Sequence, residues 1–281
     1  MGVTARISAA WQATLLGWKA ESNWTDPWAF GVFAVLRPLA SALILVFMYR
    51  VIAGQQTQAV LDFLVIGSAV WTFAVNGFTG IAWTVLLDRE DYRMLKYVYL
   101  SPMPFGVYLV ARNAYRVGTG LVSFAAPVVV AMAFLGLAFQ FRVDALPTLG
   151  AAIVVAAIGV VGFSLVIGGI TLQFTNQAWG IPEALSLALY LICGVVFPLT
   201  VIPRWLAIVG EAVPMTYWLE ATRRLLLGVE AHRALPYLSD GEILLRAAGS
   251  GSAWVVLGVI ALSWGLRRGR RLGLLDREST F

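Results

Sequence analysis

The densest group of charged side chains in this sequence lies in residues 88–104, DREDYRMLKYVYLSPMP. Six of the nine residues from Asp88 to Lys96 are acidic or basic. Charges of both signs beside tyrosines suit the recognition of another surface, through charge pairing and aromatic contact. The chemistry indicated for this stretch is therefore binding.

Covalent and metal chemistry have few candidate residues. His232 is the only histidine and Cys193 the only cysteine, so one chain cannot form a histidine cluster for metal, a Ser-His-Asp site or an internal disulfide. No GxxxxGK[ST] phosphate loop occurs. The glycines within 159–169 lie in an apolar run, where they suit close helix packing. We therefore expect a chain without enzyme activity, bound cofactor or metal.

Residues 88–100 are predicted to form one short amphipathic helix. Its basic residues recur at i, i+4 and i+7, its acids occupy the first turn, and Ser101, Pro102 and Pro104 would end it. Periodicity leaves two interpretations open: an anchor on lipid headgroups, or a docking helix for a partner protein. The residues predicted to carry docking are Asp88, Arg89, Glu90, Asp91, Tyr92, Arg93, Leu95 and Lys96.

The elements that position this helix are expected to lie in a membrane. Of the 281 residues, 60% are hydrophobic and only 12% are charged, about half the charged share of a soluble domain. This composition predicts one all-α membrane domain over residues 1–281, with six transmembrane helices. The apolar runs that predict them cover about 31–53, 59–87, 105–139, 147–172, 181–202 and 250–266.

Residues 1–30 are predicted to form a helix in the membrane surface, because their apolar stretch is short and contains tryptophan. Cytoplasmic loops carry an excess of Lys and Arg. The larger basic set lies at the termini and around 88–116, which places both termini and the charged helix in the cytoplasm. Spans one to five then occupy 31–202, an external segment 203–249, and span six with its tail 250–281. We attribute the formal charge of +5 to this rule and not to nucleic acid.

Two segments resemble the type-2 ABC exporter permeases. DREDYRMLKYVYLSPMPFGVYLVAR is similar to their cytoplasmic segment, in which a charged run, a leucine and Ser-Pro precede the third span. FPLTVIPRWLAIVGEAVPMTYWLEATRRLLLG is similar to the segment before their last span. The order of elements agrees as well, so the resemblance covers nearly the whole chain. The matching residues of the second segment are Pro198, Pro203, Trp205, Pro214, Thr216, Glu220 and Arg223.

The resemblance implies what the charged helix binds. In such exporters two permease chains form a pathway at their interface, and two ATPase subunits below them bind ATP and Mg. The cytoplasmic coupling helix between spans two and three fits a cleft on each ATPase. The second segment forms short re-entrant helices that help to close an external gate. The implied partners are thus two copies of a cytoplasmic ABC ATPase, a second copy of this permease and lipid, in a prokaryotic cell (inner) membrane.

Polar residues within the apolar runs are the candidates for the pathway. Asn76 and Thr79 either hydrogen-bond between helices or line a path, and Arg37 either reaches headgroups or serves the path. Glu220 and Arg223, spaced i and i+3, are expected to form an exposed structural ion pair that contributes about 0–1 kcal/mol.

The predicted function is export of a hydrophobic or amphipathic substrate, drug-like or lipid-like, from the cytoplasm or the inner leaflet. One alternative is a permease for a lipid-linked polysaccharide. Another is a secondary transporter driven by an ion gradient, which would need buried acids or two similar halves with broken helices. A membrane enzyme would need clustered catalytic groups, which a single histidine makes hard to assemble.

Overall fold

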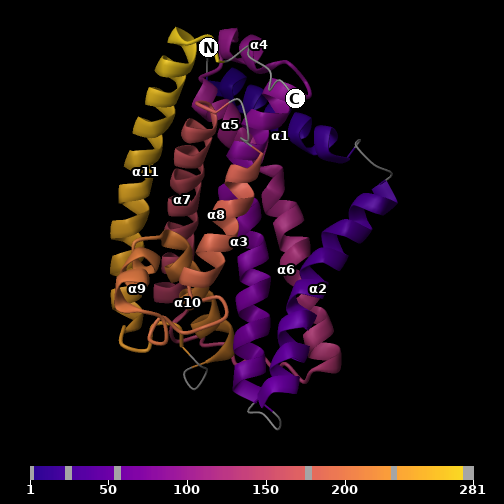
Figure 1. Cartoon of the computed structure of the whole chain (residues 1–281), viewed down its shortest axis with the longest axis vertical. Helices are drawn as coiled ribbons and strands as arrows, with labels where there is room; N and C mark the ends of the chain where they lie inside the picture. Colours follow the sequence, from indigo (N-terminus) through magenta and orange to yellow (C-terminus); the bar gives the residue numbers. More distant parts are fainter. Residues whose placement is uncertain (1–2, 23–26, 54–57, 175–178, 229–232, 275–281) are drawn as a thin grey trace.

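The computed structural model describes residues 3–22, 27–53, 58–174, 179–228 and 233–274, and the regular structure within them is entirely helical. The predicted all-α class is confirmed for these residues. Most of the helices run along one long axis (Figure 1). In chain order they are α1 (Val3–Ser22), α2 (Pro27–Ala53), α3 (Gln58–Glu90), α4 (Leu95–Leu100), α5 (Phe105–Asn113), α6 (Tyr115–Phe134), α7 (Leu146–Thr171), α8 (Gly180–Ile192), α9 (Arg204–Glu211), α10 (Pro214–Leu227) and α11 (Asp240–Arg271).

Membrane-crossing length is reached by α3, by α7, by α11 and by α5 and α6 taken together, among the residues described. The longest, α3, has 33 residues and extends over about 50 Å. Two further apolar helical stretches, Pro38–Met48 and Gly180–Ile192, are shorter. The membrane class is thereby supported, and the count of six spans stays a prediction.

The fifth apolar run, predicted to span the membrane over 181–202, is helical only as far as Ile192. Gly194 then adopts φ +78°, a left-handed conformation that ends helices and that glycine takes without steric cost. Pro198 and Pro203 follow, and proline cannot donate the hydrogen bond that a continuing helix needs. The helix prediction is therefore wrong beyond Ile192, since apolarity alone does not report where a chain turns.

The third run, predicted over 105–139, is also divided. Its helix is interrupted at Ala114, between α5 and α6, and ends at Phe134. Gly136 follows with φ +74°, which stops the helix in the same way as Gly194. The last run differs in the other direction, because α11 begins at Asp240, inside the predicted external segment.

The early start of α11 has a local cause. Ser239 and Glu242 form a reciprocal capping box, in which each side chain binds the other residue's backbone N–H. Such a box satisfies N–H groups that have no partner within the helix. The helix can therefore begin well before the apolar run at 250–266.

A seam of glycines joins α7 to α11, which run parallel to each other. A Cβ atom on Gly159 would lie 2.6 Å from Gly251 Cα, and one on Gly169 would lie 2.6 Å from Ala261 O. On the facing helix, a Cβ on Gly265 would lie 2.5 Å from Gly169 O. Real Cβ atoms do not approach other atoms so closely, so only glycine permits this backbone contact. The predicted role of the 159–169 glycines in helix packing is confirmed.

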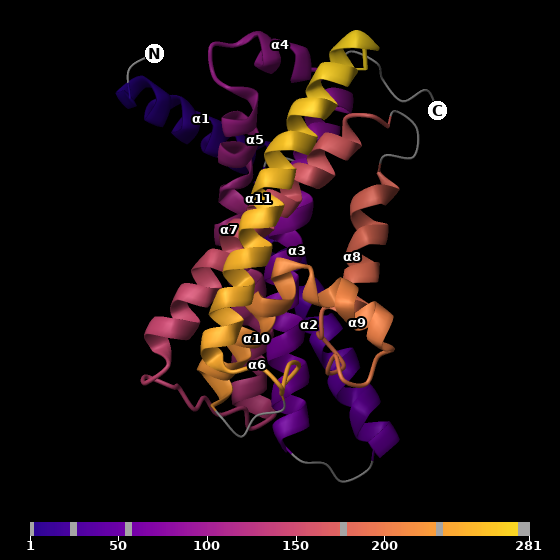
Figure 2. The same cartoon turned by 90° about the vertical axis from the view of Figure 1, so that its left-hand side faces the viewer.

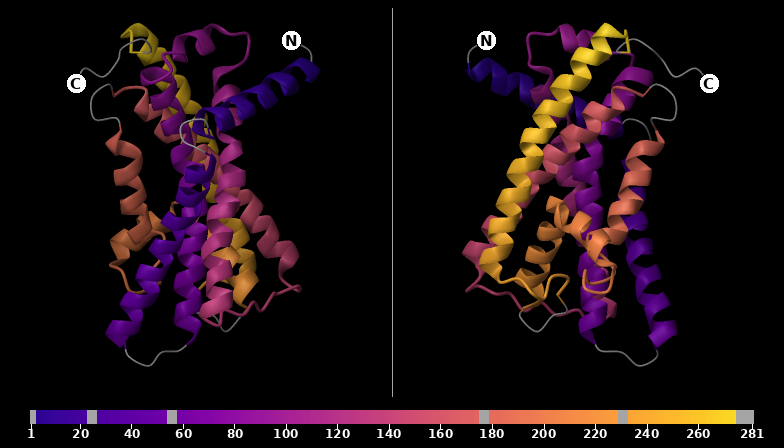
Figure 3. Two further views of the ribbon diagram at one scale, coloured as in Figure 1. Left: turned by 90° about the vertical axis from the view of Figure 1, so that its right-hand side faces the viewer. Right: turned by 60° about the vertical axis from the view of Figure 1, so that its left-hand side comes forward.

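The two ends of the bundle carry different elements. At one end lie α4, α5, the last turns of α11 and α1, which is oblique to the long helices (Figures 1 and 2). At the other end lie α9 and α10, with α10 packed against α7 and α11 and α9 against α8 (Figure 3). We call these the α4 end and the α10 end.

Candidate functional site

The charged segment 88–104 is not one helix, so the prediction of a helix over 88–100 is wrong. The second long helix, α3, continues to Glu90, and α4 begins only at Leu95. Between them Arg93 has φ +50°, in the left-handed region that non-glycine residues seldom occupy. The Met94 N–H donates to Asp88 O at 2.8 Å and closes the turn. The predicted helix thus belongs to two elements joined by a bend.

Buried ionic contacts explain why α3 continues so far. Asp88 is 0% exposed and forms an ion pair with Arg112 of α5, with 2.7 Å between Oδ1 and Nη2. The Tyr108 hydroxyl donates to Asp88 Oδ2 at 2.6 Å. The Asp88 carboxylate therefore neutralises the buried Arg112 guanidinium and accepts a hydrogen bond from the Tyr108 hydroxyl. Together these contacts fix the end of α3 against α5.

The neighbouring arginine ties α3 to a second connection. Arg89 is buried and pairs with Glu90 at 2.9 Å. Its Nη2 also donates to Phe174 O at 2.8 Å, beyond the end of α7. Asp88 and Arg89 thus stabilise the fold at the α4 end, and both side chains are buried within the chain.

The N-terminal helix is joined to the same end. The Tyr92 hydroxyl donates to Ala20 O at 3.0 Å. Arg116 of α6 pairs with Glu21 at 2.9 Å. The charged segment, α1 and α6 therefore form one connected structure at the α4 end.

These contacts determine which side chains of this segment remain exposed. Asp91, Tyr92 and Arg93 are exposed, and Lys96 is half-buried. Two exposed apolar side chains lie outside the set predicted for docking: Tyr97, which is 65% exposed, and Leu100, which is 78% exposed. They lie three residues apart on α4, and counting the helix from Leu95 would have placed them on its outer face. We call Asp91, Tyr92, Arg93, Lys96, Tyr97 and Leu100 the docking surface.

A large cavity begins beside this surface and follows α3. It has a volume of about 1030 Å³ and is bounded by α2, α3, α6 and α8, and Ala20 and Glu21 of α1 also line it. Asp91 and Tyr92 belong both to its lining and to the docking surface. The residues of α3 that line it recur at helical spacing, on one face, and are Ser68, Trp71, Thr72, Val75, Asn76, Thr79, Trp83 and Leu87.

The cavity wall mixes aromatic and weakly polar groups. Trp83 and Trp179 face each other with 5.6 Å between ring centroids, and Trp71 lies 5.7 Å from Tyr190. Asn76 and Thr79, predicted as pathway residues, both line this wall. The side chain of Arg37, the third predicted pathway residue, lies outside the described part of the structure. Such a wall can hold an apolar body and offer hydrogen bonds to a polar tip.

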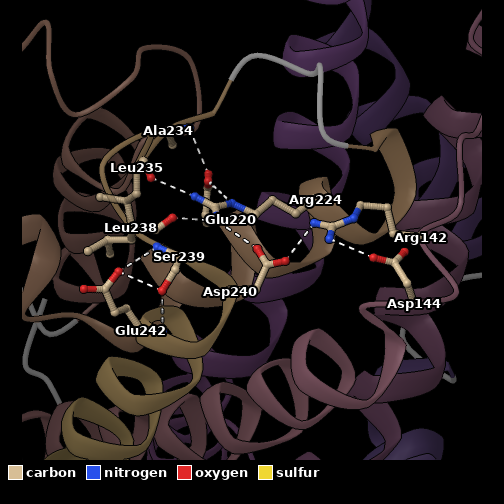
Figure 4. A network of polar contacts seen from close by, with 10 residues as sticks. All are labelled: Arg142, Asp144, Glu220, Arg224, Ala234, Leu235, Leu238, Ser239, Asp240 and Glu242. Carbon is tan, nitrogen blue, oxygen red and sulfur yellow. Dashed lines mark hydrogen bonds and ion pairs between the residues drawn. The ribbon is translucent and has the colours of Figure 1, made fainter.

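The α10 end is held by a buried polar network (Figure 4). Glu220 is 0% exposed and accepts from Arg224 Nε at 2.7 Å and from the Ala234 N–H at 2.8 Å. Arg224 also pairs with Asp240 at 2.9 Å and donates to Leu238 O. This network ties α10 to the start of α11.

Glu220 therefore does not pair with Arg223, and the predicted exposed pair is wrong on both counts. Arg223 points to the other side of α10, where it donates to the carbonyls of Gly194 and Val195, each at 2.6 Å. Its guanidinium lies 3.7 Å from the centre of the Phe63 ring. Three and four residues are both one turn of helix, so sequence spacing alone could not choose between Arg223 and Arg224.

The other predicted gate residues are spread over the same end. Pro203 precedes α9, Pro214 is the first residue of α10, and Thr216 donates to Gly210 O at 2.6 Å. Pro198 is half-buried in the turn after α8, and Trp205 is 70% exposed on α9. The structure thus gathers these residues at one end, where Pro203 and Trp205 are exposed.

Charged and polar side chains on the outside of the α10 end also contact one another. The hydrogen bond from Arg142 lowers the pKa of Asp144. Burial, together with the hydrogen bond to the Glu211 carboxylate, raises the pKa of Tyr237 to about 12. Among the residues described, no group of three or more His, Cys, Asp or Glu is placed to hold a metal ion.

Comparison with known proteins gives a family match. A family model described as ABC-2 type transporter matches residues 12–227. The match begins within α1 and ends at the last residue of α10, so it includes the docking surface, the α3 wall of the cavity and Glu220. A search of curated proteins gave no match.

Proposed function

The chain belongs to the ABC-2 type transporter family, and on this basis we propose that it is the membrane-spanning permease subunit of an ATP-driven exporter. The resemblance to type-2 ABC permeases is thereby confirmed, and the chain is a multi-pass membrane protein. Its proposed cargo is a hydrophobic or amphipathic compound, drug-like or lipid-like, which leaves the cytoplasm or the inner leaflet.

One observation carries this proposal. The cavity follows one face of α3 from Ser68 to Leu87, over about 28 Å of helix, and its lining continues into the docking surface at Asp91 and Tyr92. A partner bound at the docking surface would therefore touch residues that also line the cavity. The tryptophans and hydroxyl groups of the wall suit an amphipathic cargo.

Permeases of this family generally work with an ATPase subunit. We propose two copies of a cytoplasmic ABC ATPase, which bind ATP and Mg, and a second copy of this chain that completes the pathway. The proposed layout has six spans, α1 in the membrane surface, and a prokaryotic inner membrane with both termini in the cytoplasm. In this layout α9 and α10 form the re-entrant segment at the external gate.

The contacts at the α4 end suggest how force would pass from the ATPase. The docking surface follows α3 directly, and Asp88 binds α3 to α5 through Arg112 and Tyr108. A displacement of α4 would therefore move the ends of α3 and α5 together. The cavity wall on α3 would move with them.

The test is pull-down of the ATPase together with substrate efflux. Tyr97→Ala and Leu100→Ala each remove an exposed apolar side chain, so their double variant should lose most of the bound ATPase and most of the efflux. Asp91→Lys should act in the same direction by reversing a charge at the docking surface.

Phe141→Ala provides the matched control, because Phe141 is 60% exposed and lies in the connection between α6 and α7. It should retain the ATPase as the unchanged chain does. Full efflux and full ATPase retention in the Tyr97→Ala/Leu100→Ala variant would show that the docking surface is misassigned.

A further inference from the structure

The last turns of α11 carry a cluster of arginines that neither the cavity nor the docking surface uses. Arg267, Arg268, Arg270 and Arg271 are all exposed. Arg267, Arg270 and Arg271 line a hollow of about 460 Å³. Within the described residues, these three arginines take part in no ion pair. Among the described residues no carboxylate pairs with these arginines, so the part of the hollow that they line is strongly positive.

Aromatic rings flank the arginines. Arg268 lies over the Trp264 ring, 5.4 Å from its centre, and Arg270 lies over the Tyr99 ring of α4 at 5.4 Å. Trp264 is 48% exposed. Indole rings concentrate at the level of lipid headgroups in membrane proteins. The ring of Trp264 thus marks where the hydrocarbon would end and the headgroups would begin.

An apolar stripe leads along α11 into the hollow. Leu257, Ile260, Trp264, Arg267 and Arg271 follow one another at intervals of three, four, three and four residues, which places them on one face. Leu257 is 49% exposed and Ile260 is 58% exposed. Because the chain spans a membrane, this exposed apolar stripe suits acyl chains. The guanidinium groups lie one to two helical turns beyond the indole, at headgroup depth.

We propose that the hollow binds the phosphate group of an anionic membrane phospholipid, whose acyl chains lie along the α11 stripe. Guanidinium groups bind phosphate oxygens in pairs of parallel hydrogen bonds, which suits three arginines around one hollow. A free phosphate ion would use the arginines but not the stripe. An acidic protein partner would likewise leave the aligned apolar face unexplained.

The test measures lipid binding directly, by native mass spectrometry of the purified chain titrated with phosphatidylglycerol or phosphatidylcholine. The unchanged chain should prefer phosphatidylglycerol. Each arginine near anionic lipid contributes about fivefold in affinity, so Arg267→Gln/Arg271→Gln should weaken phosphatidylglycerol binding about 30-fold. Binding of phosphatidylcholine should not change.

The matched control is Arg204→Gln/Arg268→Gln, which removes the same charge but leaves the hollow's three arginines in place. It should weaken phosphatidylglycerol binding by no more than about fivefold, because only Arg268 of this pair lies near the headgroups. Equal loss in both double variants would mean that only net charge matters, and would overturn the site. So would a chain that does not prefer phosphatidylglycerol to phosphatidylcholine.

Two further arms identify the source of the ligand. Inorganic phosphate should not displace phosphatidylglycerol at equal concentration, and displacement would make the ligand a phosphate ion. Loss of ATPase pull-down in Arg267→Gln/Arg271→Gln with unchanged lipid binding would assign the arginines to the protein partner instead. The lipid arm uses the chain alone, so its failure leaves the proposed export function standing.

Discussion

Replacing Glu220 by alanine should destabilise the α10 end far more than removing an exposed ion pair. The carboxylate accepts from Arg224 Nε at 2.7 Å and from the Ala234 N–H at 2.8 Å, and both partners are buried. Breaking a buried ion pair by removing one member costs about 3–5 kcal/mol. A buried N–H left without an acceptor adds about 1–3 kcal/mol.

Other contacts reduce that sum. Arg224 keeps its ion pair with Asp240 at 2.9 Å, so its charge stays partly neutralised in the Glu220→Ala variant. It also keeps the carbonyls of Leu235 and Leu238. We therefore expect a loss of about 3–5 kcal/mol in total. For a chain of this size that corresponds to a fall in Tm on the order of 10 °C.

The assay can use the chain's own cysteine. Cys193 is 0% exposed, so a dye that fluoresces on reaction with a thiol reports unfolding during heating. The control is Arg204→Gln, since the Arg204–Glu211 pair is equally short at 2.6 Å but leaves Arg204 69% exposed. An exposed pair contributes about 0–1 kcal/mol. If Glu220→Ala lowers Tm no more than Arg204→Gln does, the buried network is not what holds α10.

Three other outcomes follow from the same reasoning. Asp88→Asn should lower Tm, because it leaves Arg112 buried without its counter-charge, and Tyr108→Phe should lower Tm less, because it removes one hydrogen bond. Gly169→Leu should prevent α7 from packing on α11 and lower Tm in the thiol assay. Gly249→Ala, with no atom within 4 Å of the added Cβ, should leave Tm unchanged or raise it slightly, because alanine favours a helix more than glycine does. With Cys193 replaced by serine, Ser101→Cys and Trp205→Cys should react from opposite sides of the membrane, and labelling of both from outside would refute the proposed orientation.

The sequence predicted the parts of this fold that depend on composition and small residues. Apolar runs predicted α3 and α7 almost to their ends, and the glycines at 159–169 predicted close packing before their partner helix was known. Both follow from local chemistry, since length and the lack of a side chain act wherever a helix is placed. Helix ends at Gly194 and Gly136 were missed because each depends on one backbone conformation in an otherwise apolar run.

In the candidate site, too, local chemistry predicted some features of single residues and missed others. The density of charge located the segment that carries Asp88. The prediction had all of its charged residues bind a partner protein, whereas Asp88 and Arg89 are buried within the chain. Periodicity cannot distinguish an outward charge from one that meets an arginine 24 positions later, as Asp88 meets Arg112. Tertiary contacts decide which residues pair over such distances in the sequence. They also decide that Glu220 pairs with Arg224 and not with Arg223.

One helix connects the two ends of the molecule. At the α4 end Asp88 fixes α3 to α5, and at the α10 end Arg223 lies against Phe63 of the same helix. Gly67 leaves room there, since a Cβ atom on it would overlap the Arg223 guanidinium. The cavity wall lies on α3 between these two contacts. Between them α3 is one uninterrupted helix from Gln58 to Glu90. In the mechanism proposed above, a displacement at the docking surface would reach the cavity wall and the contacts around Arg223 through α3.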